Sequence, residues 1–154
     1  MPNWCLNVTI FRNEDPEQLE KVALALREGK LMQTIHPCPE ELLDDKSTTY
    51  GGDGAEEQDK LRANLTEKYG VPNWYEWRIE NWGTKWDCSE CSEAEADLEN
   101  HMVEVSFDTA WGPPVKFYQY MESLGWKIEA YYYEPGQTFC GQYKDGVDDS
   151  YDID

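Results

Sequence analysis

The sequence has few basic residues and no long apolar run. It contains 13 Lys and Arg against 32 Asp and Glu, which gives a formal net charge of −19. Binding to bare duplex DNA or to an anionic membrane needs clustered basic residues, so neither partner is expected. No stretch approaches the roughly 18 apolar residues of a membrane span, and the first residues lack the regions of a secretion signal. We therefore expect a cytoplasmic protein.

The cysteines lack an even number for complete pairing, because there are five of them. Disulfide frameworks belong mostly to secreted domains, whereas thiols of cytoplasmic proteins stay reduced. We expect free thiols at all five positions, which are Cys5, Cys38, Cys88, Cys91 and Cys140.

Recognisable catalytic motifs are missing. The sequence has no GxSxG nucleophile motif, no glycine-rich phosphate loop and no HExxH zinc motif. Its two histidines, His36 and His101, lie in no known motif, and acid–base catalysis needs paired carboxylates or a histidine in a cleft. We expect a non-catalytic protein and assign no catalytic residues.

Aromatic residues, by contrast, are abundant. They make up 14% of the chain, and hydrophobic residues make up 40%. This apolar content offsets the entropy cost of ordering the chain, so the composition predicts a folded protein. A length of 154 residues fits one domain.

The residue pattern predicts both strands and helices. Strands are expected where apolar residues alternate or β-branched residues cluster, and helices where apolar residues recur at helical spacing. Asp15 with Pro16, and Asn73, predict two helix starts. The predicted strands are 4–12, 31–35, 84–87, 102–107, 127–134 and 138–143, and the predicted helices are 16–28, 55–69, 74–81 and 114–124. This order predicts an α+β, ferredoxin-like (βαβ…βαββ) antiparallel sheet with helices on one face.

Acidic residues gather outside these elements. Residues 40–59, 87–99 and 145–154 carry 8, 6 and 5 acids. We predict a single domain over 1–146, with acidic insertions at 40–72 (partly helical) and 87–100, and a loose acidic tail at 147–154.

Several motifs together resemble a known family. The run 81–87, Asn-Trp-Gly-Thr-Lys-Trp-Asp, is the most specific, and it is accompanied by matching stretches at 1–7, 37–42, 74–80, 107–114 and 133–136. The set resembles the uncharacterised YubB-like family of bacteriophage and plasmid proteins across residues 1–146, the acidic insertions excepted. The resemblance implies a ferredoxin-like domain and a setting on mobile elements, and it implies no activity or ligand. The Cys88/Cys91 pair and the acidic tail depart from the family pattern.

The pair Cys88 and Cys91 forms a CxxC motif, which can supply two of the four ligands of a zinc site. His36 and Cys38 are the only candidates for a second pair, and their spacing is unusual. The alternative is that Cys88 and Cys91 are two surface thiols. Redox chemistry is disfavoured, because the neighbouring Asp87 and Glu90 oppose a thiolate.

A tryptophan-rich stretch suggests either a binding platform or a core. Exposed aromatic rings can stack on bases or on a ligand, whereas aromatic stripes in small domains usually pack inside. In a mixed arrangement, most of the tryptophans are buried and one or two line a pocket. The candidate binding residues are Trp74, Trp77, Trp82, Lys85, Trp86, Asp108 and Trp111. For Asp108 the alternative is a structural role, as a cap of the helix that follows.

The acidic segments lead to our first functional hypothesis. One interpretation is that they are solvated loops. The other is that their carboxylates are spaced like phosphates and compete with DNA for the DNA-binding groove of a host protein. We predict a non-catalytic phage or mobile-element accessory protein that binds a basic host protein as an acidic DNA mimic. A small-ligand or single-stranded nucleic-acid-binding module with a Trp/Tyr-rich surface is one alternative, and a zinc-stabilised scaffold is another.

Overall fold

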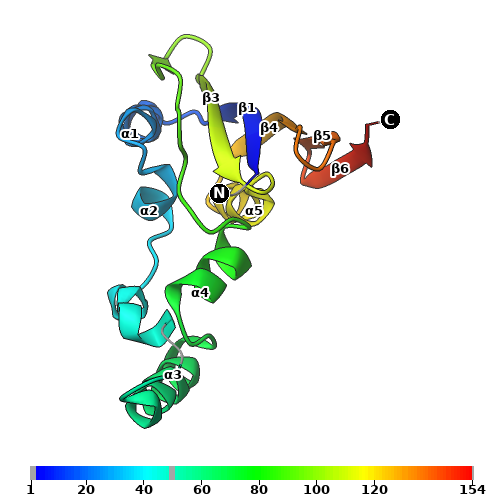
Figure 1. Cartoon of the computed structure of the whole chain (residues 1–154). Helices are drawn as coiled ribbons and strands as arrows, with labels where there is room; N and C mark the ends of the chain where they lie inside the picture. Colours follow the sequence, from blue (N-terminus) through cyan, green and yellow to red (C-terminus); the bar gives the residue numbers. More distant parts are fainter. Residues whose placement is uncertain (1–2, 49–50, 154) are drawn as a thin grey trace.

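The centre of the fold is strand β1 (Trp4–Arg12), which pairs on both sides within one sheet, as the computed structural model shows (Figure 1). The structure describes residues 3–48 and 51–153. Parts of three predicted regions lie outside the described residues: residues 1–2 of the domain, residues 49–50 of the first acidic insertion and residue 154 of the tail.

The sheet has six strands, and every neighbouring pair is antiparallel. The strand order is β2-β3-β1-β4-β5-β6. The strands that follow β1 in the chain are β2 (Ala96–Asp97), β3 (Met102–Ala110), β4 (Lys127–Glu134), β5 (Phe139–Lys144) and β6 (Val147–Asp152). Together with the helices they confirm the α+β class.

Alternation along β1 separates a covered face from an open one. Cys5, Asn7 and Thr9 are fully buried, whereas Leu6 and Val8 between them are exposed. Successive side chains of a strand point to opposite faces, so one face of the sheet is packed and the other is in contact with solvent.

Helices cover only the packed face. The helices are α1 (Pro16–Arg27), α2 (Leu31–Ile35), α3 (Ala55–Tyr69), α4 (Trp74–Asn81) and α5 (Val115–Ser123), with two short 3-10 turns at Glu40–Leu43 and Asp45–Thr48. The predicted N-caps are confirmed: Asp15 Oδ1 accepts from Glu17 N, and Asn73 Oδ1 accepts from Glu76 N, both at 2.9 Å.

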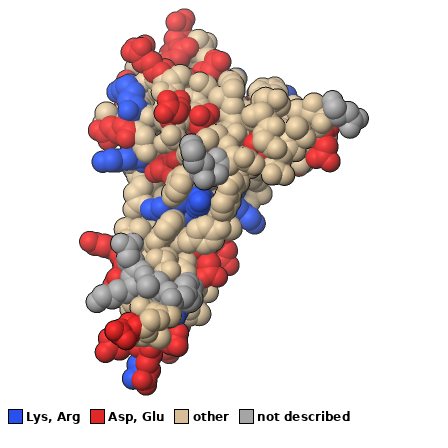
Figure 2. Space-filling model, viewed as in Figure 1, with Lys and Arg blue, Asp and Glu red and all other residues tan. Residues whose placement is uncertain are grey.

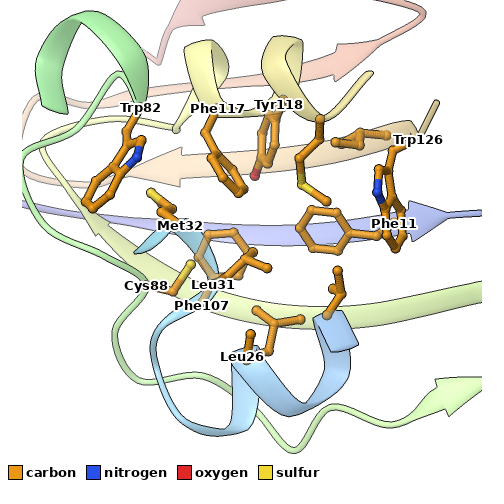
Figure 3. Packing of buried hydrophobic residues seen from close by; sticks show 14 of the residues in the cluster. Phe11, Leu26, Leu31, Met32, Trp82, Cys88, Phe107, Phe117, Tyr118 and Trp126 are labelled. Atoms are coloured by element: carbon orange, nitrogen blue, oxygen red, sulfur yellow. The ribbon is translucent and has the colours of Figure 1, made fainter. Parts of the chain in front are cut away.

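One apolar core joins the helices to the sheet. Figure 3 shows Leu26 of α1, Met32 of α2 and Phe117 of α5 pointing into the same interior as Phe11 and Phe107 from the strands. Burial of each such side chain contributes about 1.5–3 kcal/mol.

Buried polar groups on the packed face are hydrogen-bonded. Asn7 Nδ2 donates to the oxygen of Phe107 and to Thr109 Oγ1, at 3.2 and 2.9 Å. The hydroxyls of Thr9 and Tyr118 lie 2.9 Å apart. These bonds offset the desolvation cost of polar atoms inside the core.

The predicted strand at 31–35 is wrong, because these residues form α2. The carboxylate of Asp87 accepts hydrogen bonds from Met32 N and Gln33 N, both at 2.9 Å. A carboxylate more than fifty residues along the chain therefore caps this helix, and a local pattern does not reveal such a partner.

The insertion after α2 forms a lobe that extends from the sheet. In Figure 1, α3 lies at the end of the lobe farthest from the sheet, and α4 lies between α3 and α5. The predicted helices at 55–69 and 74–81 are confirmed with these bounds.

The predicted strand at 84–87 is also wrong, because residues 83–86 form bends. Thr84 Oγ1 donates to the oxygen of Ala110 at 2.9 Å, so a side chain, not a strand ladder, holds this segment to β3. The segment 87–100, predicted as a solvated insertion, instead lies along the outer edge of β3. It contains β2, and Ser89 exchanges two backbone hydrogen bonds with Asp108.

The prediction of a loose tail at 147–154 is wrong for residues Val147–Asp152, because they form strand β6. The Asp145-Gly146 turn joins β5 to β6, and both residues have positive φ, 52° and 79°. Two left-handed residues match the right-handed twist of a two-residue hairpin, for which Asp-Gly is a strong sequence signal.

Candidate functional site

Lys85 lies between two exposed indole rings. Its Nζ is 4.3 Å from the ring centroid of Trp86 and 4.3 Å from that of Trp111. The ring electrons attract the ammonium group from both sides. The two tryptophans are 37% and 44% exposed, so solvent reaches this arrangement.

The two tryptophans belong to a longer series of rings. Trp4 lies 5.8 Å from Trp86, and Tyr75 lies 6.5 Å from Trp111, between ring centroids. We call Trp4, Trp86, Trp111 and Tyr75, with Lys85 between the middle two, the aromatic row. It runs from the first residue of β1 to the first turn of α4.

Arg78 supports the aromatic row from inside. Its guanidinium lies 4.8 and 4.9 Å from the rings of Trp74 and Trp82, which are one turn away on either side along the chain. Arg78 Nη1 donates to the backbone oxygen of Lys85 at 3.1 Å. Partial burial lowers the pKa of Arg78, although a guanidinium remains charged at any physiological pH.

The structure divides the predicted tryptophans into two groups. Trp77 and Trp82 are buried in the core, where Trp82 Nε1 donates to the oxygen of His36 at 2.9 Å. Trp74 is half-buried, and only Trp86 and Trp111 belong to the exposed row.

The predicted polar candidate Asp108 lies away from the aromatic row's centre. It is in β3 opposite Leu6, so its side chain lies on the open face of the sheet. It does not cap the next helix, because α5 begins after Pro114 without a side-chain cap. Burial raises the pKa of Asp108, and the nearby charge of Glu90 adds to the increase.

The open face carries a second exposed aromatic surface, which our sequence analysis did not select. Cross-strand register places Leu6, Tyr133, Cys140 and Tyr151 in one row across the sheet, and Val8 and Tyr131 in the next. We call Leu6, Val8, Tyr131, Tyr133 and Tyr151 the open-face patch. Each of the five is at least 39% exposed. The signal was the repeat Tyr131-Tyr132-Tyr133, since alternation puts its first and third rings on the face opposite to buried Tyr132.

Acidic residues adjoin the open-face patch. The row that contains Leu6 begins at Asp108 on β3, and the row that contains Val8 ends at Asp149 on β6. These rows, all of whose residues the structure describes, contain no Lys or Arg. Tyr131 donates to Glu129 Oε1 at 2.7 Å, which raises the pKa of the tyrosine hydroxyl.

The predicted metal ligands Cys88 and Cys91 are close together near the edge of β3. Burial raises the pKa of Cys88, and a hydrogen bond from Cys88 lowers that of the more accessible Cys91. Within residues 3–48 and 51–153, no group of three or more His, Cys, Asp or Glu could hold a metal ion. His36 is stacked on Tyr120 with ring centroids 3.7 Å apart.

All five cysteines are free, as the sequence analysis predicts. None of the helices in the described part of the chain is long and apolar enough to cross a membrane.

Comparisons with known proteins give one distant structural similarity. Neither a protein-family model nor a curated protein sequence matches the chain. A solved structure, that of a protein named api92 from Yersinia pseudotuberculosis with the family model DUF1281, is similar to this chain. It has 11% sequence identity and a TM-score of 0.49, and the similarity covers 100% of this chain and 99% of that one. No residue role is transferred at this similarity, and the resemblance to YubB-like proteins stays a prediction.

Proposed function

We propose that the chain is a non-catalytic binding module that docks a basic segment of a partner protein on the open face of its sheet. The observation that carries this proposal is the open-face patch: five large, exposed apolar or aromatic side chains in two rows, each with a carboxylate at one end. Contiguous exposed apolar surface of this kind is typical of interaction sites.

The chemistry of the patch favours cations over anions. Tyr131 and Tyr133 are exposed aromatic rings, which can attract Lys and Arg side chains, and Asp108 and Asp149 add negative charge in the same two rows. Phosphates would meet these carboxylates and a net charge of −19, which argues against single-stranded nucleic acid as the partner.

The aromatic row extends this surface. Trp4 and Leu6 point to the same face of β1, and the ring of Trp4 contacts that of Trp86. A partner segment on the open-face patch can therefore continue along exposed rings toward α4.

The arrangement of acids supports local docking more than mimicry of a DNA duplex. Figure 2 shows the acidic residues in separate groups, near the β2–β3 end, around α3 and beside β6, with uncharged and basic residues between them. A duplex mimic needs carboxylates in a continuous array, as phosphates are along a helix.

We further propose that the sheet is an elaborated ferredoxin-like arrangement. The order β2-β3-β1-β4 supports it, because α1 lies in the chain between β1 and β2, and α5 between β3 and β4. On this view β5 and β6 extend the edge beside β4, and the lobe is inserted before β2. A cytoplasmic setting belongs to the same proposal, and the free cysteines support it.

Fluorescence anisotropy with a labelled peptide of alternating arginine and glycine tests the docking proposal. The double variant Y131S/Y133S keeps the net charge, so general attraction between the acidic protein and the basic peptide is unchanged. We expect its affinity for the peptide to fall by about tenfold, because exposed rings at an interface centre dominate binding.

The matched control is Leu24→Ser, which removes an exposed apolar side chain from α1. It should bind the peptide as the wild type does. Equal affinity of Y131S/Y133S and the wild type, with both variants folded by circular dichroism, would show general charge attraction and contradict the proposal.

A further inference from the structure

A groove lies at the α4 end of the aromatic row. Its volume is about 460 Å³, and it is lined by Val71, Tyr75, Glu76, Ile79, Glu80 and Trp111. Tyr75 and Glu76 lie on one turn of α4, and Ile79 and Glu80 lie on the next. Trp111, which follows the last residue of β3, closes the groove. The volume is sufficient for one long side chain with its nearest waters.

The walls of the groove are aromatic. The rings of Tyr75 and Trp111 lie edge to face, with an interplanar angle of 75°. Ile79, one turn after Tyr75, is also exposed and completes an apolar floor. Tyr75 and Trp111 are 36% and 44% exposed, so solvent reaches both walls.

Trp111 is held in this position by a strained backbone. Its φ is 71°, in the left-handed region that a bulky residue rarely adopts. The backbone N–H of Trp111 donates to the oxygen of Asn3 at 2.7 Å, which fixes this conformation. Strain of this kind persists where the surrounding structure imposes it, often at ligand sites.

Trp111 already binds a cation of its own chain. Lys85 Nζ lies 4.3 Å from its ring centroid, yet Lys85 does not line the groove. One wall of the groove is therefore an indole ring that already attracts a cation elsewhere on its surface.

Two carboxylates, those of Glu76 and Glu80, also line the groove. Glu76 and Glu80 are one helical turn apart, where like charges repel each other. Glu76 accepts a 3.3 Å hydrogen bond from Asn73, and neither glutamate forms an ion pair with a side chain that the structure describes, a set that omits residues 45, 46, 49 and 50. A cation between them would turn this repulsion into attraction.

We propose that the groove binds one arginine side chain of the partner protein, an inference that rests on the proposed function. A guanidinium is planar and weakly hydrated, so it stacks on indole and phenol rings and donates to two carboxylates at once. The compact ammonium of lysine can also approach a ring, as Lys85 does, but it cannot stack flat on the ring or form a bidentate pair with a carboxylate. The groove thus supplies specificity for arginine beside a docking surface that accepts any basic segment.

NMR titration with N-acetyl-arginine methylamide tests the proposal on the full chain. The readout is the indole N–H resonance of Trp111, assigned with the variant Trp111→Phe. We expect a saturable shift with the arginine compound and none with its citrulline analogue, which has the same shape without the charge. The variant E76Q/E80Q should weaken arginine binding by about threefold or more.

The control variant E93Q/E95Q removes the same charge from the β2 region, where both glutamates are exposed. Its affinity for the arginine compound should stay within about 1.5-fold of the wild type, because these charges are screened from the groove. Equal shifts with citrulline, or equal weakening in both double variants, would overturn the proposal.

The two proposals fail separately. Y131S/Y133S should leave the Trp111 shift unchanged, because these tyrosines do not line the groove. If the basic peptide binds through the open face while the arginine compound leaves Trp111 unmoved, only the arginine groove is wrong. If Trp111 responds but Y131S/Y133S binds the peptide normally, the open-face proposal is wrong.

Discussion

Arg78 donates a hydrogen bond from Nη1 to the backbone oxygen of Lys85, at 3.1 Å. Arg78 is held between two rings of the α4 region, and Lys85 between two rings of the surface. The bond therefore joins an inner cation–ring sandwich to an outer one, and the inner sandwich positions the segment that carries the candidate site.

The first prediction concerns this link. Arg78→Met keeps most of the apolar stem but removes the hydrogen bond and both ring contacts, and should lower the free energy of unfolding by about 2 kcal/mol. Urea denaturation followed by tryptophan fluorescence measures the change. Lys21→Met, at an exposed position of α1, should stay within about 0.5 kcal/mol of the wild type. Similar losses in the two variants would contradict the structural role of Arg78.

The second prediction concerns a close approach in the sheet. A Cβ on Gly141 would lie 2.5 Å from the backbone oxygen of Asp149 and 2.5 Å from the hydroxyl oxygen of Tyr132. Gly141→Ala should destabilise the fold by about 2 kcal/mol, because the β5–β6 pairing and the bond from Tyr132 to Asp148 must both shift.

Thermal unfolding measures this loss, and Gly112→Ala is the control. The nearest atom to a Cβ on Gly112 is a ring carbon of Phe139 at 4.0 Å, an ordinary contact distance. A melting temperature of Gly141→Ala equal to that of Gly112→Ala would be inconsistent with the register of β5 and β6.

The third prediction concerns Asp87 and pH. Burial raises the pKa of Asp87 above its usual value, despite three backbone N–H groups that favour the charged form. Between the unfolded-state pKa of about 4 and the higher folded-state pKa, the native protein holds a proton that the unfolded chain has lost. The contribution of Asp87 to stability is therefore largest at acid pH and falls as pH rises from about 4 through the folded-state pKa.

The neutral variant Asp87→Asn removes this dependence and part of the α2 cap. The stability difference between wild type and variant should be greater at pH 4.5 than at pH 7.5, as urea denaturation at the two values would show. A difference that grows with pH would mean that the three N–H groups outweigh burial.

The fourth prediction concerns the CxxC pair. Cys91 is accessible and has a lowered pKa, whereas Cys88 is buried with a raised pKa. Only the thiolate reacts with iodoacetamide, so Cys91 should be alkylated first by at least about tenfold in rate at neutral pH. Peptide mass spectrometry after timed quenching measures both rates. Faster labelling of Cys88 would show that this segment opens readily.

Local sequence signals predicted much of the secondary structure. Asp15 and Asn73 cap helices as expected, and the strands at 4–12 and 127–134 have the predicted bounds. The errors involve partners distant in the chain. Residues 31–35 are helical with a cap from Asp87, and the segment before β2 pairs with β3 through Ser89. Periodicity contains no information about such contacts.

The candidate site was predicted only in part, because it too depends on contacts between residues distant in the chain. Lys85, Trp86 and Trp111 were selected from the sequence, and the structure brings them together. The open-face patch was missed because an exposed tyrosine in a strand has the same sequence pattern as a buried one. Which face of β4 stays uncovered depends on where α1 and α5 pack, and this is a property of the tertiary fold.

The last strand of the sheet has a consequence for self-association. No strand in the described part of the chain pairs with the outer side of β6, which leaves a row of backbone hydrogen-bonding groups free. Such an edge is a template for strand addition by another molecule. Asp148, Asp149 and Asp152 lie along it, and the same edge of a second copy would bring the same charges against them. Electrostatic repulsion between these aspartates thus opposes edge-to-edge aggregation of the sheet that carries the exposed tyrosines.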